Sequence, residues 1–163
     1  MISKTYFPLF LFITLFSSLS NASDLSVHMT LSPAGSFDAK TAKLRGDVVK
    51  SGDKYTADSL WVKIEDLKTG IDLRDDHFHK HLNFEKFPKI SMTNIVAQSG
   101  KGSAMLTING VPNKQDFTYK QINDKKIEAH FNVKPSAYKL KEAKYLEIGV
   151  DDDVEVTASM DVK

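Results

Sequence analysis

The chain has 163 residues, with 22 lysines and arginines against 21 aspartates and glutamates, and it contains no cysteine. Without cysteine, neither disulfides nor a lipid-modified N-terminus can form, so the hydrophobic core alone must hold the fold. The balanced charge gives no basic surface of the kind that nucleic-acid-binding proteins need, and nucleic acid is not an expected partner.

Residues 1–22 have the pattern of a cleavable signal peptide. Lys4 supplies a positive charge, residues 6–16 form an apolar run, and residues 20–22 match the small-residue pattern before a cleavage site. The apolar run is shorter than the roughly 20 residues of a membrane span. We therefore expect export to the periplasm, no stable membrane span, and a mature chain that forms one domain over residues 23–163.

Alternation of apolar and polar residues with period two dominates the mature chain and predicts β-strands with one buried face. Turn signals at residues 52–53, 100–102, 110–113 and 123–124 separate several of these segments. Eight strands are predicted, over residues 25–31, 44–49, 55–65, 90–97, 103–108, 116–121, 127–134 and 154–162.

Short strands joined mainly by hairpins leave exposed edges unless the sheet closes on itself. We therefore predict an all-β fold, an eight-stranded antiparallel barrel with one short helix between strands. Such a barrel is either filled by its own side chains or able to hold one small ligand, and the alternation does not distinguish these cases. The predicted inward face, which is also the candidate surface for an apolar ligand, consists of Val27, Met29, Leu60, Val62, Ile64, Ile90, Met92, Leu106, Ile108, Phe117, Tyr119, Phe131 and Val156.

One central segment departs from period two and predicts the helix, over residues 73–82. Asp72 is expected to be its N-cap, and Asp75 and Asp76 suit the positive end of the helix dipole. Pro88 disfavours helical geometry in the residue before it, so the helix should end before it and a strand should follow.

Three histidines in this segment, His77, His79 and His81, leave two interpretations open. In a strand the three imidazoles would share one face and could bind zinc, copper or nickel, which would make a metal-binding or stress-response protein the alternative function. In a helix only His77 and His81 converge, and His79 points elsewhere. We favour the helix, and we predict no bound metal and no other cofactor.

The sequence lacks the motifs of common catalytic sites. There is no Gly-x-Ser-x-Gly elbow and no glycine-rich phosphate loop, and Asp151-Asp152-Asp153 lacks the alternating ligands and glycine of a calcium-binding EF-hand loop. An enzyme is therefore not predicted. Trp61 lies on the face of its strand opposite Leu60, so it is expected either to be covered by the helix or to contact a second subunit, and the second case implies a homodimer.

Several motifs, in order along the chain, resemble those of the YceI-like family. The two most specific are Arg74-Asp75-Asp76-His77 and Phe84-Glu85-Lys86-Phe87-Pro88-Lys89-Ile90. The resemblance implies an exported, lipocalin-like barrel that binds long isoprenoid chains such as polyprenyl or quinone tails. It also implies that Arg74, Asp75 and His77 lie at the barrel rim, whereas His79 and His81 are additions to the signature. Further matches are Gly35-Ser36-Phe37 with Gly46-Asp47, Leu67-Lys68-Thr69-Gly70, Leu106 to Val111, Pro135 to Tyr138, and Gly149 to Val156.

The expected function is a periplasmic binding protein that holds a long-chain apolar amphiphile inside the barrel. A polyisoprenoid, quinone-type or fatty-acyl tail would suit the apolar inward face. Because burial of each methylene contributes about 0.8 kcal/mol, such a chain can bind with few polar contacts and needs no catalytic residues.

Overall fold

The computed structural model describes residues 23–141, 144–145 and 148–163, so the predicted signal peptide, residues 1–22, lies outside the described residues. Within these ranges, no helix has both the length and the apolar character that crossing a membrane requires.

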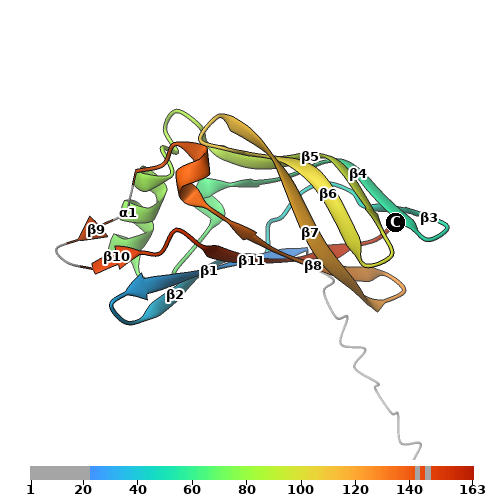
Figure 1. The fold of residues 1–163 in the computed structure, drawn as a ribbon, viewed down its shortest axis with the longest axis horizontal. Helices are drawn as coiled ribbons and strands as arrows, with labels where there is room; N and C mark the ends of the chain where they lie inside the picture. The colour runs from blue at the N-terminus through green and yellow to red at the C-terminus, as the bar shows by residue number, and fades with distance from the viewer. Residues whose placement is uncertain (1–22, 142–143, 146–147) are drawn as a thin grey trace, which may run out of the picture.

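In the described part of the chain, eleven strands form one antiparallel sheet that curls on itself (Figure 1). Most neighbours in the sheet are also neighbours in sequence, and β11 and β1 join the two ends of the chain. The order is β3-β4-β5-β6-β7-β8-β11-β1-β10-β9, with β2 also paired to β1. The strands are β1 (Asp24–Ser32), β2 (Ser36–Thr41), β3 (Val49–Ser51), β4 (Lys54–Lys63), β5 (Lys89–Gln98), β6 (Lys101–Ile108), β7 (Val111–Asn123), β8 (Lys126–Val133), β9 (Lys144–Tyr145), β10 (Ile148–Val150) and β11 (Val154–Asp161).

The curled sheet is joined to itself by the segment between β2 and β3. Val48 pairs in parallel with Val162, and the Lys163 N–H donates to the Val48 carbonyl at 2.9 Å. On the other side of the same segment, Arg45 pairs with Trp61 of β4. These bridges connect β4 with Val162, the residue that follows β11. The predicted all-β, lipocalin-like antiparallel barrel with one helix is confirmed, with more strands than the eight expected.

The differences in strand number have physical causes. The segment expected as a strand over residues 44–49 mostly forms the isolated bridges just described, and β3 begins only at its end. β2 was not predicted because only Ala39 among its side chains is buried, so it has no clear alternation. The short strands β9 and β10 were also not predicted.

The turn expected at residues 110–113 lies earlier than predicted. Asn109 and Gly110 both have positive φ, 51° and 72°, and make the turn themselves, so β7 already begins at Val111 and runs through Pro112. β8 pairs with β7 only from Thr118 onward, which leaves the first half of β7 as an edge where proline is tolerated.

The helix, α1 (Asp72–His81), is within one residue of the prediction, but the predicted N-cap is wrong. The N-cap is Ile71, which has extended backbone and no side-chain cap, and Asp72 is the first helical residue. Two short 3-10 helices, η1 (Ile64–Asp66) and η2 (Pro135–Tyr138), follow β4 and β8. In Figure 1, α1 lies across one end of the barrel, close to η2 and β10, and β3 lies at the opposite end.

Gly46 is the residue in the closing segment that has no room for a side chain. Its φ is +121°, and a Cβ there would lie 2.2 Å from the Ser59 carbonyl oxygen. We expect Gly46→Ala to lower the free energy of unfolding by about 3 kcal/mol or more, because a disfavoured φ and a clash with backbone act together. Gly52→Ala is the matched control, since Gly52 also has positive φ (+64°) but nothing within 4 Å of the added carbon, and it should cost about 1 kcal/mol. Urea unfolding measures both, and equal losses would show that the approach to β4 does not constrain the fold.

Candidate ligand-binding cavity

The barrel is hollow rather than filled by its own side chains. A cavity of about 1270 Å³ lies inside it, bordered by side chains from β1, β2, β4, β5, β6, β7, β8, β10, β11 and α1. A single water needs only about 10–15 Å³ by the same kind of measure, and ligand pockets are typically about 300–1,000 Å³. The cavity can therefore accommodate a ligand of considerable length.

Most of the predicted inward face borders this cavity. Ile64 and Tyr119 do not. Ile64 is wholly buried in η1, where the strand has ended and period two no longer applies. Tyr119 packs edge-on against Tyr55, with ring centroids 5.3 Å apart. The predicted residues that border the cavity are Val27, Met29, Leu60, Val62, Ile90, Met92, Leu106, Ile108, Phe117, Phe131 and Val156.

One face of α1 supplies lining that strand periodicity could not reveal. Arg74, His77, Phe78 and His81 border the cavity, and their spacing of three, four and seven residues places them on one helical face. Leu82, just after the helix, also borders it. The predicted helix already placed His77 and His81 on one face, and the same spacing extends that face to Arg74 and Phe78, but spacing alone does not show which face borders a cavity.

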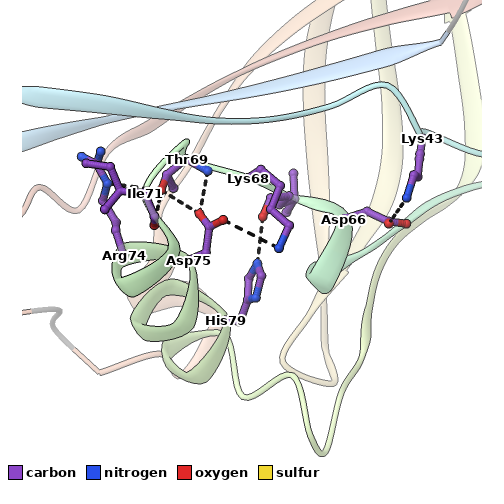
Figure 2. A network of polar contacts seen from close by, with 9 residues as sticks. Lys43, Asp66, Lys68, Thr69, Ile71, Arg74, Asp75 and His79 are labelled. Carbon is purple, nitrogen blue, oxygen red and sulfur yellow. Dashed lines mark hydrogen bonds and ion pairs between the residues drawn. The ribbon is translucent and has the colours of Figure 1, made fainter.

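The opposite face of α1 is anchored to the loop that follows η1 (Figure 2). The buried carboxylate of Asp75 accepts hydrogen bonds from the backbone N–H and the hydroxyl of Thr69, both at 2.7 Å, and Lys68 Nζ lies 3.7 Å away. Burial alone would raise the pKa of the Asp75 carboxyl, but the Thr69 hydrogen bonds and the nearby lysine outweigh it and lower the pKa below its usual value. Asp75 does not border the cavity, so its role here is to hold the helix.

His79 is the second anchor on this face. It is buried, and its Nε2 lies 2.8 Å from the Leu67 carbonyl oxygen, which can only accept, so Nε2 carries the proton. Its ring lies 6.0 Å from the rings of both Phe78 and Phe84. His79 thus points away from the cavity that His77 and His81 border.

The alternative of a three-histidine metal site is therefore wrong in its geometry, because the segment is helical and the three imidazoles do not share a face. Among the residues that the structure describes, no group of three metal-ligating side chains comes together.

Arg74 lies at the cavity-facing edge of this anchored helix. Its Nε donates to Thr69 Oγ1 at 3.2 Å, and its guanidinium lies over the Phe37 ring, 4.7 Å from the centroid. Phe37 belongs to β2 and also borders the cavity. Arg74 is therefore held in place by a hydroxyl and an aromatic face.

The remaining charged lining comes from the chain that follows η2 and from the chain around β10. Ser136 donates its backbone N–H to Asp152 at 2.8 Å and its hydroxyl to the other carboxylate oxygen, and these bonds lower the pKa of Asp152. Lys141 and Asp151 also border the cavity. Since α1, η2 and β10 lie at the same end of the barrel, the charged lining is gathered there and the interior is apolar (Figure 1).

Trp61 is half-buried on β4. Arg45 and Lys89 lie over its ring, with the charged groups 5.3 Å and 4.2 Å from the centroid, so two cations cover the surface for which a helix or a second subunit had been considered. The homodimer remains a prediction.

An antiparallel barrel with an internal apolar cavity and one polar end defines a lipocalin-like class of proteins. Within that class the chain belongs to the YceI family, because the model described as YceI-like domain matches residues 17–162.

Solved structures share the fold. A polyisoprenoid-binding domain from Saccharophagus degradans, implicated in plant cell wall breakdown, superposes with a TM-score of 0.62 at 14% identity and covers 86% of this chain and 92% of that one. A Campylobacter jejuni YceI protein superposes with a TM-score of 0.55 at 19% identity, covering 73% and 80% respectively. At these identities the similarity shows the fold. No curated protein matches the sequence significantly.

The anchor on α1 gives a pH-dependent prediction. Asp75→Asn should lower the free energy of unfolding at pH 7 by about 2–3 kcal/mol, because it removes the charge from a buried, doubly hydrogen-bonded acceptor. The folded pKa is depressed, so the carboxylate's contribution is present above its ordinary value near pH 4 and is lost as the pH falls through the folded pKa. The difference in free energy of unfolding between wild type and Asp75→Asn should therefore become smaller in acid.

Urea unfolding at pH 7 and at pH 3 measures this difference. Asp76→Asn is the matched control, since Asp76 is the exposed next residue of the same helix, and it should change stability by less than about 0.5 kcal/mol. If the difference in free energy of unfolding between wild type and Asp75→Asn is the same at both pH values, the ionised Asp75 carboxylate is not the anchor of α1.

Proposed function

We propose that the protein binds an amphiphile by enclosing its apolar chain in the barrel, with the polar group at the end where α1, η2 and β10 lie. The observation that carries this proposal is the cavity itself, about 1270 Å³ and lined mainly by aliphatic and aromatic side chains. An empty apolar cavity of this size forfeits contacts that a well-packed core would make. A bound chain would restore them.

The energetics favour a long, flexible hydrocarbon over a compact ligand. Each methylene transferred from water contributes about 0.8 kcal/mol, so affinity grows with chain length and requires few polar groups. The lining supplies few polar groups away from the α1 end. A polyisoprenoid, quinone-type or fatty-acyl tail meets these requirements, and the polyisoprenoid is supported by what the Saccharophagus domain is described as binding.

Filling the cavity should abolish this binding. Ala129 of β8 borders the cavity and is 4% exposed, so Ala129→Phe places a ring in the space that the chain would occupy. We expect geranylgeraniol to bind at least about tenfold more weakly, which corresponds to about 1.4 kcal/mol. Displacement of a fluorescent fatty acid measures the affinity, and thermal unfolding establishes that the variant is folded.

Met105→Phe is the matched control, because Met105 is on β6, 37% exposed, and does not border the cavity. It should bind within about twofold of wild type. Ala158→Phe, on the strand paired with β8 at Ala129, provides a second cavity-filling variant. Folded variants at both alanines that bind like wild type would overturn the proposal.

We also propose that the protein works in the periplasm after removal of residues 1–22, and the support is the charge, apolar run and small-residue pattern of that segment. The intact mass of protein recovered from the periplasm should correspond to a chain that begins at Ser23. Ala22→Phe should leave the precursor uncleaved, because the small side chain before the cleavage site is lost, whereas Ser23→Ala should be processed normally. A full-length mass for the wild type would exclude this proposal.

A further inference from the structure

The cavity-facing side of α1 presents hydrogen-bond donors that nothing in the described protein uses. A guanidinium carries five N–H donors, and Arg74 directs one of them to Thr69. None of the carboxylates described in the structure lies within ion-pair distance of Arg74, and neither His77 nor His81 has a hydrogen-bond partner among the described residues.

The nearest carboxylate in sequence is already engaged. Asp75 follows Arg74 directly, but it lies on the other face of the helix and takes its hydrogen bonds from Thr69, with Lys68 as its nearest cation. Figure 2 shows the Arg74 side chain directed away from the carboxylate of Asp75. The Asp75 carboxylate therefore anchors the helix, and Arg74 borders the cavity without a carboxylate partner among the described residues.

Two carboxylates, those of Asp151 and Asp152, also border the cavity at this end, and neither lies within ion-pair distance of Arg74. Asp152 is bound to Ser136, and Lys141 adds a further positive charge. The lining of this end thus carries Asp151 and Asp152 against Arg74 and Lys141, and what favours an anion beside α1 is the position of the Arg74 donors rather than an excess of positive charge. A ligand group placed against α1 meets one fixed cation and two imidazoles that can donate.

Such a set of donors suits an anion. Arginine binds phosphate or carboxylate through two parallel hydrogen bonds, and the interaction strengthens where protein excludes water. Burial lowers the pKa of His81, so this imidazole is neutral at pH 7 and offers one N–H without adding charge.

We propose that Arg74, His77 and His81 bind an anionic head group, a phosphate or a carboxylate, on the ligand whose apolar chain occupies the barrel. This inference rests on the proposed function and extends it from the tail to the head group. The ligand would then be an acidic amphiphile, such as a polyprenyl phosphate or a fatty acid, rather than a neutral alcohol or an amine.

Four probes with one chain test this inference: geranylgeraniol, geranylgeranyl monophosphate, geranylgeranoic acid and geranylgeranylamine. The wild type should bind the phosphate or the acid about tenfold or more tightly than the alcohol, because a hydrogen bond to a charged partner contributes more than a neutral one. A preference for the phosphate alone points to polyprenyl phosphates, and an equal preference for the acid points to fatty acids as well. Both outcomes support the proposal.

Arg74→Gln should remove this preference while the affinity for the alcohol stays within about twofold of wild type. Arg74→Lys keeps the charge but not the paired donors, so it should retain part of the preference. Lys80→Gln is the matched control, because Lys80 is an exposed cation of the same helix that does not border the cavity, and it should change neither affinity.

The remaining outcomes overturn the inference in distinct ways. Equal binding of alcohol and anions would show that α1 does not recognise charge, and tighter binding of the amine would assign the head group to Asp151 and Asp152. A loss of affinity for all four probes in a folded Arg74→Gln variant would reduce Arg74 to a structural role. Failure of every probe to bind the wild type would instead overturn the proposed function.

Discussion

The structure depends on the way that α1 is fastened across one end of the barrel. Asp75 and His79, four residues apart, bind the loop after η1 through the Thr69 hydroxyl and backbone N–H and through the Leu67 carbonyl. Both side chains are buried, so neither bond competes strongly with water. Residues four apart lie on one helical face, and fixing that face also fixes the opposite one. Arg74, His77 and His81 are thereby held toward the cavity.

A helix with so few apolar residues would not pack in this orientation through hydrophobic burial alone, and the polar anchors supply the orientation instead.

The sheet closes into a barrel through backbone hydrogen bonds, and this closure does not require side chains to fill the interior. Consecutive hairpins and the pairing of β11 with β1 satisfy the backbone hydrogen bonds, and the segment around Arg45 and Val48 joins the edges. The backbone network can therefore persist around space that side chains leave open, whereas a helical bundle of the same size would collapse onto such a void. Away from the α1 end, the lining residues are mainly aliphatic and aromatic, so a water molecule there would find few hydrogen-bond partners. A barrel of this kind is suited to an apolar guest that enters and leaves without unfolding the protein.

Much of the fold and part of the cavity could be predicted from the sequence, for reasons that particular residues make clear. Period two placed Leu60, Val62 and Leu106 on the inner face because their strands are regular and buried on one side. It could not place Ile64, which follows the end of β4, and it missed β2, where only Ala39 is buried. Turn positions were less accurate, because the turn expected at residues 110–113 is made by Asn109 and Gly110, which both have positive φ. The hollow interior was not predictable at all, since a filled and an empty barrel show the same alternation, and only the side-chain volumes set against the barrel radius decide between them.

The segment Arg74 to His81 shows why a cluster of chemically suggestive residues needs its local geometry before it can be given a role. As a strand it would form a metal site. As a helix, the same residues lie on two faces. Asp75 and His79 contact the loop after η1, and Arg74, His77 and His81 border the cavity. The division separates the Asp75 carboxylate from the Arg74 guanidinium, because adjacent residues of a helix do not face each other. Arg74 is bordered by an aromatic ring and a hydroxyl and lacks a described carboxylate partner, so it is partly desolvated without a countercharge. The anion that would compensate it most directly is one that arrives with the ligand.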